Sequence, residues 1–437
     1  MSDLYRPDWP LVKISDFAEI NIGGTPSRAA PQFWATKPEG SPWIAISDLK
    51  GKYVDDTKEY ITNLGAKCSN VRLIEPFTTV MSFKLTVGRT AIITRPMYCN
   101  EAIAIFSSKS DALSGSWLYH ALPRAALSVV TDNAVKGATL NKAKMAEMTV
   151  QLPPITEQSK IALILDTLDT TIRETEALID KLKAVNQGLL HDLLTRGIDA
   201  NGQLRPPKSE APQLYKESQL GWIPREWEAV ELSQLIDPKR PVVYGILMPG
   251  YGYTGGVPVV KVKDIYDGKI HLNDLLLTCP KIDREYSRSR LKTGDLLFTI
   301  RGTVGRTAFV PPALNSANIT QDTARLAVVG TDARYLRAYL GMAVPRRFIA
   351  THTLGVAVQG INLRDVRRIP IALPSALEAK AIADEIQSQE QRLESESLSA
   401  AKVRRVKAGL MDDLLTGRVR VTPLLESMQP SSAPTEA

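Results

Sequence analysis

A hexapeptide that occurs twice sets the architecture of this chain. TVGRTA spans Thr86 to Ala91 and again Thr303 to Ala308. With typical residue frequencies near one in sixteen, six consecutive identities are expected by chance in only about one such chain in a hundred. Duplication is therefore the first hypothesis, and it predicts further matches at a similar offset.

Other segments do repeat at a similar offset. PWIAISDL, which begins at Pro42, parallels PVVKVKDI, which begins at Pro258. Downstream, GLLHDLLT from Gly188 aligns with GLMDDLLT from Gly409 at an offset of 221 residues. Because this repeat is far longer than the roughly 20 to 50 residues of solenoid proteins, we expect two copies of a domain and its connecting segment.

Composition limits the class of protein. With 437 residues, 44% hydrophobic and 23% charged, the chain suits two or three globular domains. Its net charge of +7 is typical of proteins that meet a polyanion, although many basic proteins bind none. The N-terminus lacks a signal-peptide pattern and no apolar run approaches the length of a membrane span, so we expect a cytoplasmic protein.

Each copy shows the same order of local patterns. Short β-rich runs alternate with turns, and a helical patch follows, near residues 114–127 in the first copy and 333–344 in the second. We therefore expect an α+β fold with two similar mixed α/β domains.

A long helical segment follows each domain. Apolar residues recur there in alternating steps of four and three, the heptad pattern of a helix with a narrow apolar seam. Pro precedes each segment and Gly197 or Gly417 follows it, as expected at helix starts and stops. The second seam is weaker in its middle. The predicted seam residues are Ile161, Leu165, Leu168, Ile172, Ile179, Leu182, Leu189, Leu193, Ile382, Ile386, Leu393, Val403, Leu410 and Leu414.

These helices are too long to be covered by their own domains. A helix of roughly 35 to 40 residues is about 55 Å long. The other copy is the simplest partner, and a two-fold relation between the copies would make the two helices an antiparallel coiled coil. The alternative, in which each helix packs separately on its own domain, stays open at this point.

The pattern divides the chain into six segments. They are a first domain (1–150), a first long helix (151–200), a polar, Pro-rich linker (201–220), a second domain (221–372), a second long helix (373–420) and a disordered tail (421–437).

No motif of catalytic chemistry is found. Gly250, Gly252 and Gly255 satisfy G-x-G-x-x-G, but no apolar strand leads in and Pro258 follows where a helix should begin, so a flexible loop is favoured. Phosphate-loop, H-E-x-x-H and G-x-S-x-G motifs are absent from the sequence. The four His residues are far apart, which favours surface or capping roles, and the three Cys residues form no C-x-x-C pair. We predict neither catalytic residues nor a metal site.

Basic residues gather near predicted turns and strand ends. Lys and Arg there can neutralise phosphates, and Arg can read base edges in the major groove. The alternative is an ordinary solvated surface. The candidates for DNA contact are Lys50, Lys52, Lys84, Arg89, Lys261, Lys263, Arg288, Arg290, Arg301 and Arg306.

The duplicated hexapeptide itself is interpreted as a structural turn. Gly88 and Gly305 fit a tight turn in which a side chain would obstruct the backbone, and the flanking β-branched residues suit strands. Arg89 and Arg306 can reach a phosphate or pair with a carboxylate in their own domain, and both alternatives stay open.

With this two-copy plan, the chain closely resembles the specificity subunit of Type I restriction-modification enzymes. The motifs that carry the resemblance are QLPPITEQSKIA at the start of the first long helix, GLLHDLLT and GLMDDLLTGRV at the helix ends, and YKESQLGWIPREWEAVEL at the start of the second copy. The resemblance covers nearly the whole chain. The first copy departs in detail, with SFKLTVGR where the second has TIRGTVGR, which leaves base contacts unassigned at the residue level.

The resemblance implies a noncatalytic reader of double-stranded DNA. Residues 1–150 and 221–372 would be two target recognition domains, held by an antiparallel pair of conserved helices, and each would read one half of a bipartite asymmetric site. The helices would dock two methyltransferase subunits, which methylate adenine with S-adenosylmethionine, and restriction subunits, which use ATP and Mg. No cofactor is expected in this chain. A stand-alone DNA-binding protein and an enzyme with an unrecognised site are the alternatives.

Overall fold

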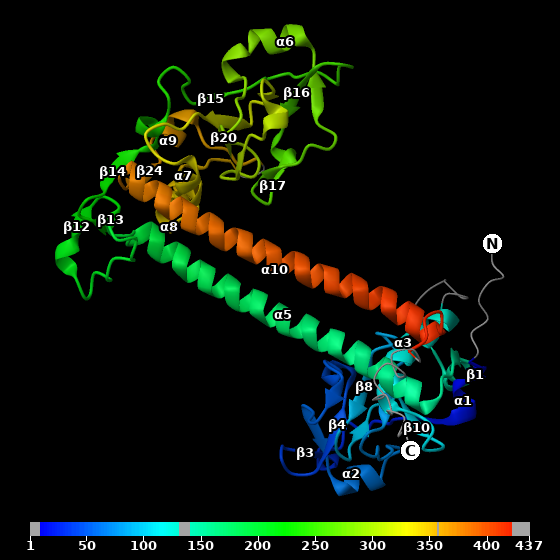
Figure 1. Cartoon of the computed structure of the whole chain (residues 1–437). Helices are drawn as coiled ribbons and strands as arrows, with labels where there is room; N and C mark the ends of the chain where they lie inside the picture. The colour runs from blue at the N-terminus through cyan, green and yellow to red at the C-terminus, as the bar shows by residue number, and fades with distance from the viewer. Residues whose placement is uncertain (1–8, 131–139, 356–357, 422–437) are drawn as a thin grey trace, which may run out of the picture. The chain divides into compact units, whose positions relative to one another are not determined.

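The computed structural model describes residues 9–130, 140–355 and 358–421. The chain divides into two compact units, one made of residues 1–177 and 397–437 and the other of residues 178–396 (Figure 1). Each unit holds one domain together with half of each of two long helices, α5 (Ile155–Thr195) and α10 (Ala376–Thr416).

The first unit contains the N-terminal α+β domain. Its main sheet has the strand order β2-β10-β7-β8-β5, and a second sheet has the order β3-β6-β4-β9. Its elements are β1 (Leu11–Lys13), α1 (Ile14–Phe17), β2 (Ala18–Ile22), β3 (Trp34–Ala35), β4 (Ser41–Ile44), β5 (Tyr53–Val54), β6 (Glu59–Ile61), α2 (Asn63–Lys67), β7 (Thr79–Ser82), β8 (Thr90–Ile93), β9 (Tyr98–Cys99), β10 (Ile103–Ser108), α3 (Gly115–Val130), α4 (Lys142–Ala146) and β11 (Thr149–Gln151).

The second unit repeats this plan. Its sheet β15-β23-β20-β21 corresponds to the main sheet of the first unit, and the sheet β19-β16-β22 corresponds to the second. Its elements are β12 (Tyr215–Ser218), β13 (Gly221–Pro224), β14 (Glu228–Glu231), β15 (Val243–Tyr244), β16 (Val257–Val260), β17 (Ile265–Tyr266), β18 (Lys269–Ile270), β19 (Leu276–Thr278), α6 (Pro280–Glu285), β20 (Leu296–Thr299), β21 (Thr307–Phe309), β22 (Asn318–Ile319), β23 (Thr323–Leu326), α7 (Ala333–Leu340), α8 (Ala343–His352), α9 (Leu363–Arg367) and β24 (Pro370–Leu373).

The duplicated hexapeptide forms the same turn in both units, as the sequence predicts. Gly88 and Gly305 have φ values of 86° and 91°, a region that favours glycine. In the first unit the amide of Arg89 donates to Ser82 Oγ at 3.2 Å, and in the second the amide of Arg306 donates to Thr299 Oγ1 at 2.9 Å. A hydroxyl at the end of the incoming strand therefore fixes the turn in each copy.

The second duplicated segment also folds alike in both units. Strand β4 pairs in parallel with β9, and β16 pairs in parallel with β22. A short 3₁₀ turn follows each strand. Asp48 accepts the amide of Ala45 at 2.9 Å, and Asp264 accepts the amide of Lys261 at 2.8 Å. The shared sequence thus specifies the same strand and the same cap in both units.

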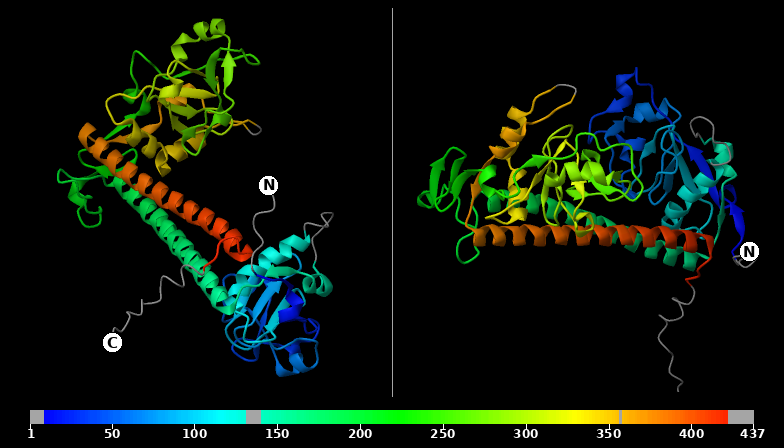
Figure 2. Two further views of the ribbon diagram at one scale, coloured as in Figure 1. Left: turned by 45° about the vertical axis from the view of Figure 1, so that its right-hand side comes forward. Right: turned by 90° about the horizontal axis from the view of Figure 1, so that it is seen from above.

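The two long helices pair in an antiparallel manner within each unit (Figure 2). In the first unit Lys407 of α10 contacts Asp169 of α5, and Arg404 contacts Glu176. In the second unit Asn186 Nδ2 of α5 lies 3.4 Å from the carbonyl oxygen of Gln389 of α10. Residue numbers therefore fall along α10 as they rise along α5. The helices also contribute to the domain cores. Leu165 and Leu414 join the core of the first unit, and Leu193 and Ile382 join that of the second.

A largely buried ion pair, which we call a terminal clasp, closes the helix pair in each unit. Glu157 in the first turn of α5 accepts from Arg420, which follows α10, with Arg420 Nε at 3.0 Å. Glu378 in the first turn of α10 accepts from Arg205, which follows α5, with Arg205 Nη2 at 3.2 Å. Carboxylates are also favoured at helix N-termini by the helix dipole. Each helix start is thereby fixed to the segment that follows the other helix.

Three parts of the chain differ from the sequence-based expectations. Residues 201–220 are not a plain linker, because Arg205 and Tyr215 are buried and β12 pairs with β13. Val421, expected in the disordered tail, is buried in the core of the first unit, while residues 422–437 lie outside the described residues. The helical patch at 333–344 is two helices, α7 and α8, which break at Gly341.

We predict that the Glu378→Ala variant loses about 3 to 5 kcal/mol of unfolding free energy. The substitution leaves Arg205 buried without its main partner, and it also removes the acceptor of Trp227 Nε1 and of the Ile198 amide, at 3.1 and 3.0 Å. Urea denaturation measures the loss. The control is Glu390→Ala on the exposed face of the same helix, expected within about 0.5 kcal/mol of the parent. Equal effects of the two substitutions would contradict the clasp.

Candidate nucleic-acid interface

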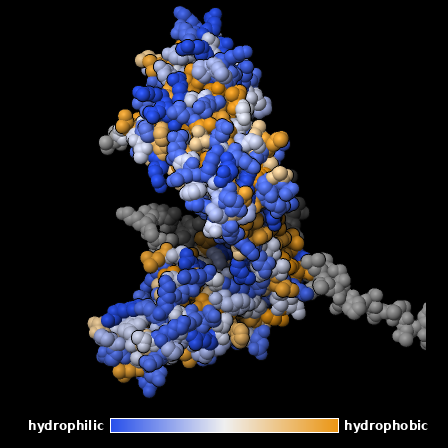
Figure 3. Space-filling model, turned by 90° about the vertical axis from the view of Figure 1, so that its left-hand side faces the viewer, coloured by the Kyte–Doolittle hydropathy of each residue, from blue (hydrophilic) through white to orange (hydrophobic). Residues whose placement is uncertain are grey.

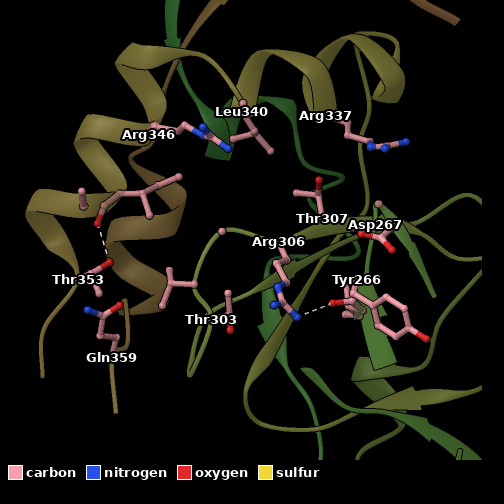
Figure 4. Close-up of a pocket in the computed structure, with 17 residues that line it drawn as sticks. Tyr266, Asp267, Thr303, Arg306, Thr307, Arg337, Leu340, Arg346, Thr353 and Gln359 are labelled. Atoms are coloured by element: carbon pink, nitrogen blue, oxygen red, sulfur yellow. Dashed lines mark hydrogen bonds between the residues drawn. The ribbon is translucent and has the colours of Figure 1, made fainter. Parts of the chain in front are cut away.

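The duplicated turn of the second unit forms one wall of a cavity of about 770 Å³ (Figure 4). Arg306 lies on this turn, and its Nη1 donates to the carbonyl oxygen of Ile265 at 3.0 Å. Helices α7 and α8 add Arg337 and Arg346 to the lining, against one acidic residue, Asp267. Three guanidinium groups around one opening make a positively charged surface suited to an anionic ligand.

The corresponding turn of the first unit is basic but has a different shape. Arg89 is exposed on it, and Lys84 lies half-buried with its Nζ 5.6 Å from the ring centroid of Phe83. Leu85 is exposed at the tip with a φ of 61°. The two copies therefore share the turn and differ in the side chains that surround it.

The structure places the predicted contact residues in two groups. Lys50, Arg89, Lys263, Arg288, Arg301 and Arg306 are exposed, and Lys52, Lys84, Lys261 and Arg290 are half-buried. Two of the half-buried residues are held by carboxylates within their own unit. Lys52 contacts Asp166 of α5, and Arg290 Nε donates to Asp283 at 2.8 Å. These pairings compete with any phosphate contact of Lys52 and Arg290, whereas the exposed group meets solvent directly.

A second cavity of about 630 Å³ in the second unit brings Arg288 and Arg290 together with basic residues that were not singled out for DNA contact. These are Lys239, Arg240, Lys292 and Arg325, and Arg337 and Arg346 of the first cavity were missed as well. The sequence held a signal for Lys239 and Arg240, and another for Arg325. DPKRP at 237–241 lies between apolar runs, and Arg325 interrupts the apolar strand TARLAV. Figure 3 shows one face of the whole molecule, and this face is largely hydrophilic with scattered apolar residues.

The predicted seam residues all lie in buried or half-buried positions of α5 and α10. Polar residues interrupt the seam, as at Asn186 and Lys407, which contact the other helix within their own unit. In the second unit a largely apolar groove of about 220 Å³ lies between the helices and includes Leu189, Leu190 and Ile386.

The surface role expected for the histidines is wrong for His120. This side chain is 2% exposed, and its Nε2 lies 2.9 Å from Asp166 Oδ1 of α5. The same carboxylate contacts Lys52, whose Nζ donates to Ser116 Oγ at 3.1 Å. Burial lowers the pKa of His120, and the hydrogen bond to Asp166 opposes this effect only in part. The neutral imidazole thus fixes the domain of the first unit to α5.

Other chemistry is limited in the part of the chain that the structure describes. Within residues 9–130, 140–355 and 358–421, no group of three His, Cys, Asp or Glu side chains could hold a metal ion. Among the same residues, no helix is long and apolar enough to cross a membrane. Gly250, Gly252 and Gly255 have positive φ values, and a Cβ added to any of them would have no atom within 4 Å, in agreement with the predicted loop.

We predict that acid destabilises the first unit through His120. Because the folded-state pKa is lowered, the unfolded chain binds a proton more readily as pH falls through the ordinary value of 6.5, and stability falls with it. The His120→Gln variant keeps a side-chain amide for Asp166 but does not titrate. Denaturation midpoints at about pH 7.5 and about pH 5.5 should differ more for the parent than for the variant. The same difference in both proteins would contradict the assignment.

Comparisons with known proteins agree on one family. A family model described as the type I restriction modification DNA specificity domain matches residues 7–184. The chain is 27% identical over 356 residues to the type I restriction enzyme EcoBI specificity subunit of Escherichia coli, covering 79% of this chain and 72% of that protein. It is 21% identical over 435 residues to the MjaVIII specificity subunit of Methanocaldococcus jannaschii, covering 95% and 94%.

Solved structures share the fold along almost the whole length. The HsdS subunit from Thermoanaerobacter tengcongensis has a TM-score of 0.52 at 16% identity, covering 95% of this chain and 99% of that one. A chain from a structural study of complex assembly in a type I R-M system has a TM-score of 0.57 at 15% identity, covering 95% and 100%.

Proposed function

Because the chain belongs to the specificity subunits of type I restriction-modification enzymes, we propose that it reads a bipartite, asymmetric DNA site and directs partner subunits to it. It is a noncatalytic DNA-recognition subunit. The observation that carries this function is the pair of domains of one plan, each fixed to the shared helices α5 and α10 within its own unit.

The differences between the domains support the reading of two different half-sites. The turn and strand caps are common to both units, whereas the basic residues around them are not. The exposed lysines and arginines suit phosphate contact, and arginine can also form two hydrogen bonds to guanine in the major groove. We assign one half of the site to each domain.

We propose that the partners supply all of the chemistry. These are two methyltransferase subunits that use S-adenosylmethionine to methylate adenine, and restriction subunits that require ATP and Mg. The assembly acts on DNA in the cytoplasm. The long helices carry exposed apolar side chains that are available to partners docking there. They are Leu163, Leu178 and Val185 on α5, and Leu377, Leu398 and Val406 on α10.

Methylation mapping tests this function. DNA is sequenced by a long-read method from cells that express the chain with its neighbouring methyltransferase, and from cells that express the methyltransferase alone. We expect a new bipartite motif with methyladenine in both halves only when the chain is present.

Three outcomes would contradict the proposal. Methylation that does not depend on the chain would show that the methyltransferase reads DNA by itself. Methylation or cleavage of DNA by the purified chain alone would favour an enzyme, and binding of DNA without any co-purified partner would favour a stand-alone DNA-binding protein.

A further inference from the structure

The second cavity of the second unit is lined by six cationic side chains. Lys239 and Arg240 precede strand β15, three more residues follow helix α6, and the last comes from strand β23. The six are Lys239, Arg240, Arg288, Arg290, Lys292 and Arg325. Such a concentration of like charge is unfavourable unless anions balance it.

The carboxylates bonded to these cations are already occupied. Asp295 accepts two hydrogen bonds from Arg240, at 2.7 and 2.6 Å, and also accepts the amide of Lys292 at 2.7 Å. Asp283 accepts from Arg290. Asp237 and Asp295 also attract Arg325 electrostatically. Three acids therefore lie near six cations, and the cavity retains an excess of positive charge.

Arg325 is the most unusual of the six. It is 2% exposed, and its Nη atoms donate only to backbone carbonyl oxygens, those of Arg288 at 2.6 Å, Arg290 at 3.2 Å and Pro241 at 3.1 Å. Its Nε is buried and has no hydrogen-bond partner among the described residues. No carboxylate of the described residues lies within ion-pair distance of it. A buried guanidinium without a carboxylate is costly, which indicates that an anion is missing.

The fold itself does not require an arginine at this position. Arg325 pairs with Leu297 on the strand that leads into the duplicated turn, and the corresponding pair in the first unit is Ile105 with Val80. Ile105 is buried in an apolar core. Since the same strand position is apolar in one copy, the arginine and its cationic neighbours point to a ligand that is specific to the second unit.

We propose that this cavity binds a phosphate group, and that in the assembled complex this group is one backbone phosphate of the DNA read by the second unit. Arginine forms paired, charge-assisted hydrogen bonds with phosphate oxygens. Among the lining residues, Arg288 and Lys292 are exposed and accessible to an incoming phosphate, whereas Arg325 is buried. Binding balances the buried charge. The DNA source of the phosphate depends on the proposed function, whereas the phosphate chemistry does not.

The test scans a single neutral methylphosphonate along both halves of the mapped site, using the full chain in its methyltransferase complex. One position should weaken binding by the parent by about 10-fold. The same methylphosphonate should leave the affinity of an Arg288→Gln, Lys292→Gln variant unchanged, because that variant has already lost the contact. If the methylphosphonate weakens binding by the parent and by the double variant equally at every position, the assignment of the cavity to a DNA phosphate is overturned.

Two further variants keep the result interpretable. Arg325→Ile places at position 325 the residue type that the first unit has at Ile105, so this variant should fold. Its affinity for DNA should likewise be unaffected by the methylphosphonate. Lys269→Gln removes one exposed charge of the same unit, where the lysine pairs with Glu394 of α10. It should retain the full response to the methylphosphonate.

A second arm separates a DNA phosphate from free phosphate. The melting temperature of the full chain without DNA is measured in inorganic phosphate and in chloride at equal ionic strength. In one outcome, inorganic phosphate stabilises the parent but not the Arg288→Gln, Lys292→Gln variant, while no methylphosphonate position distinguishes the two proteins. This combination would assign the cavity to a free anion and overturn the DNA source. The absence of both effects would overturn the phosphate site. Equal binding of mapped and scrambled duplexes would instead refute the proposed function.

Discussion

The terminal clasps hold the architecture together, because each ties the start of one long helix to the chain that leaves the other. Glu157 meets Arg420 in the first unit, and Glu378 meets Arg205 in the second. Buried ion pairs of this kind add little net stability compared with apolar contacts, but a broken one is costly. We infer that their main role is to select one register of two helices whose seam is weakened by polar residues.

The duplicated sequence and the divergent sequence have separate physical roles. The common hexapeptide and the common aspartates at positions 48 and 264 build turns and caps that any copy of the domain needs. The basic residues lie around these elements and differ between the copies. Arg325 opposite Leu297 and Ile105 opposite Val80 show the contrast at one strand position. A stable frame thus leaves the surface free to change, as two different half-sites require.

Much of this fold could be predicted from the sequence because its signals are local. Heptad spacing indicated both helices, and the repeated glycine indicated the turn. The terminal clasps could not be predicted, since each joins residues far apart in the chain, 173 positions in the case of Arg205 and Glu378. For the same reason the segment around Arg205 resembled a linker, although the burial of that arginine makes it structural.

The candidate site was only partly predictable. Charge and turn position indicated exposed residues such as Arg288 and Arg306, but they could not reveal that Asp166 contacts Lys52 or that Asp283 holds Arg290. His120 was misjudged because a lone histidine in a helical pattern carries no signal of the carboxylate on another helix. Tertiary contacts decide which charges remain available to a ligand, and local sequence does not encode them.

The central claim is that each unit reads its own half of the DNA site. An iron chelate that generates hydroxyl radicals can be tethered to a cysteine in place of Thr86 or of Thr303, the exposed first residues of the duplicated turn. The chain used has Ser in place of the exposed Cys68 and the half-buried Cys279. Cleavage of DNA that carries the mapped site is then located by sequencing. The account predicts cleavage centred on one half-site from Thr86 and on the other from Thr303. Cleavage centred on the same half-site from both positions would contradict it.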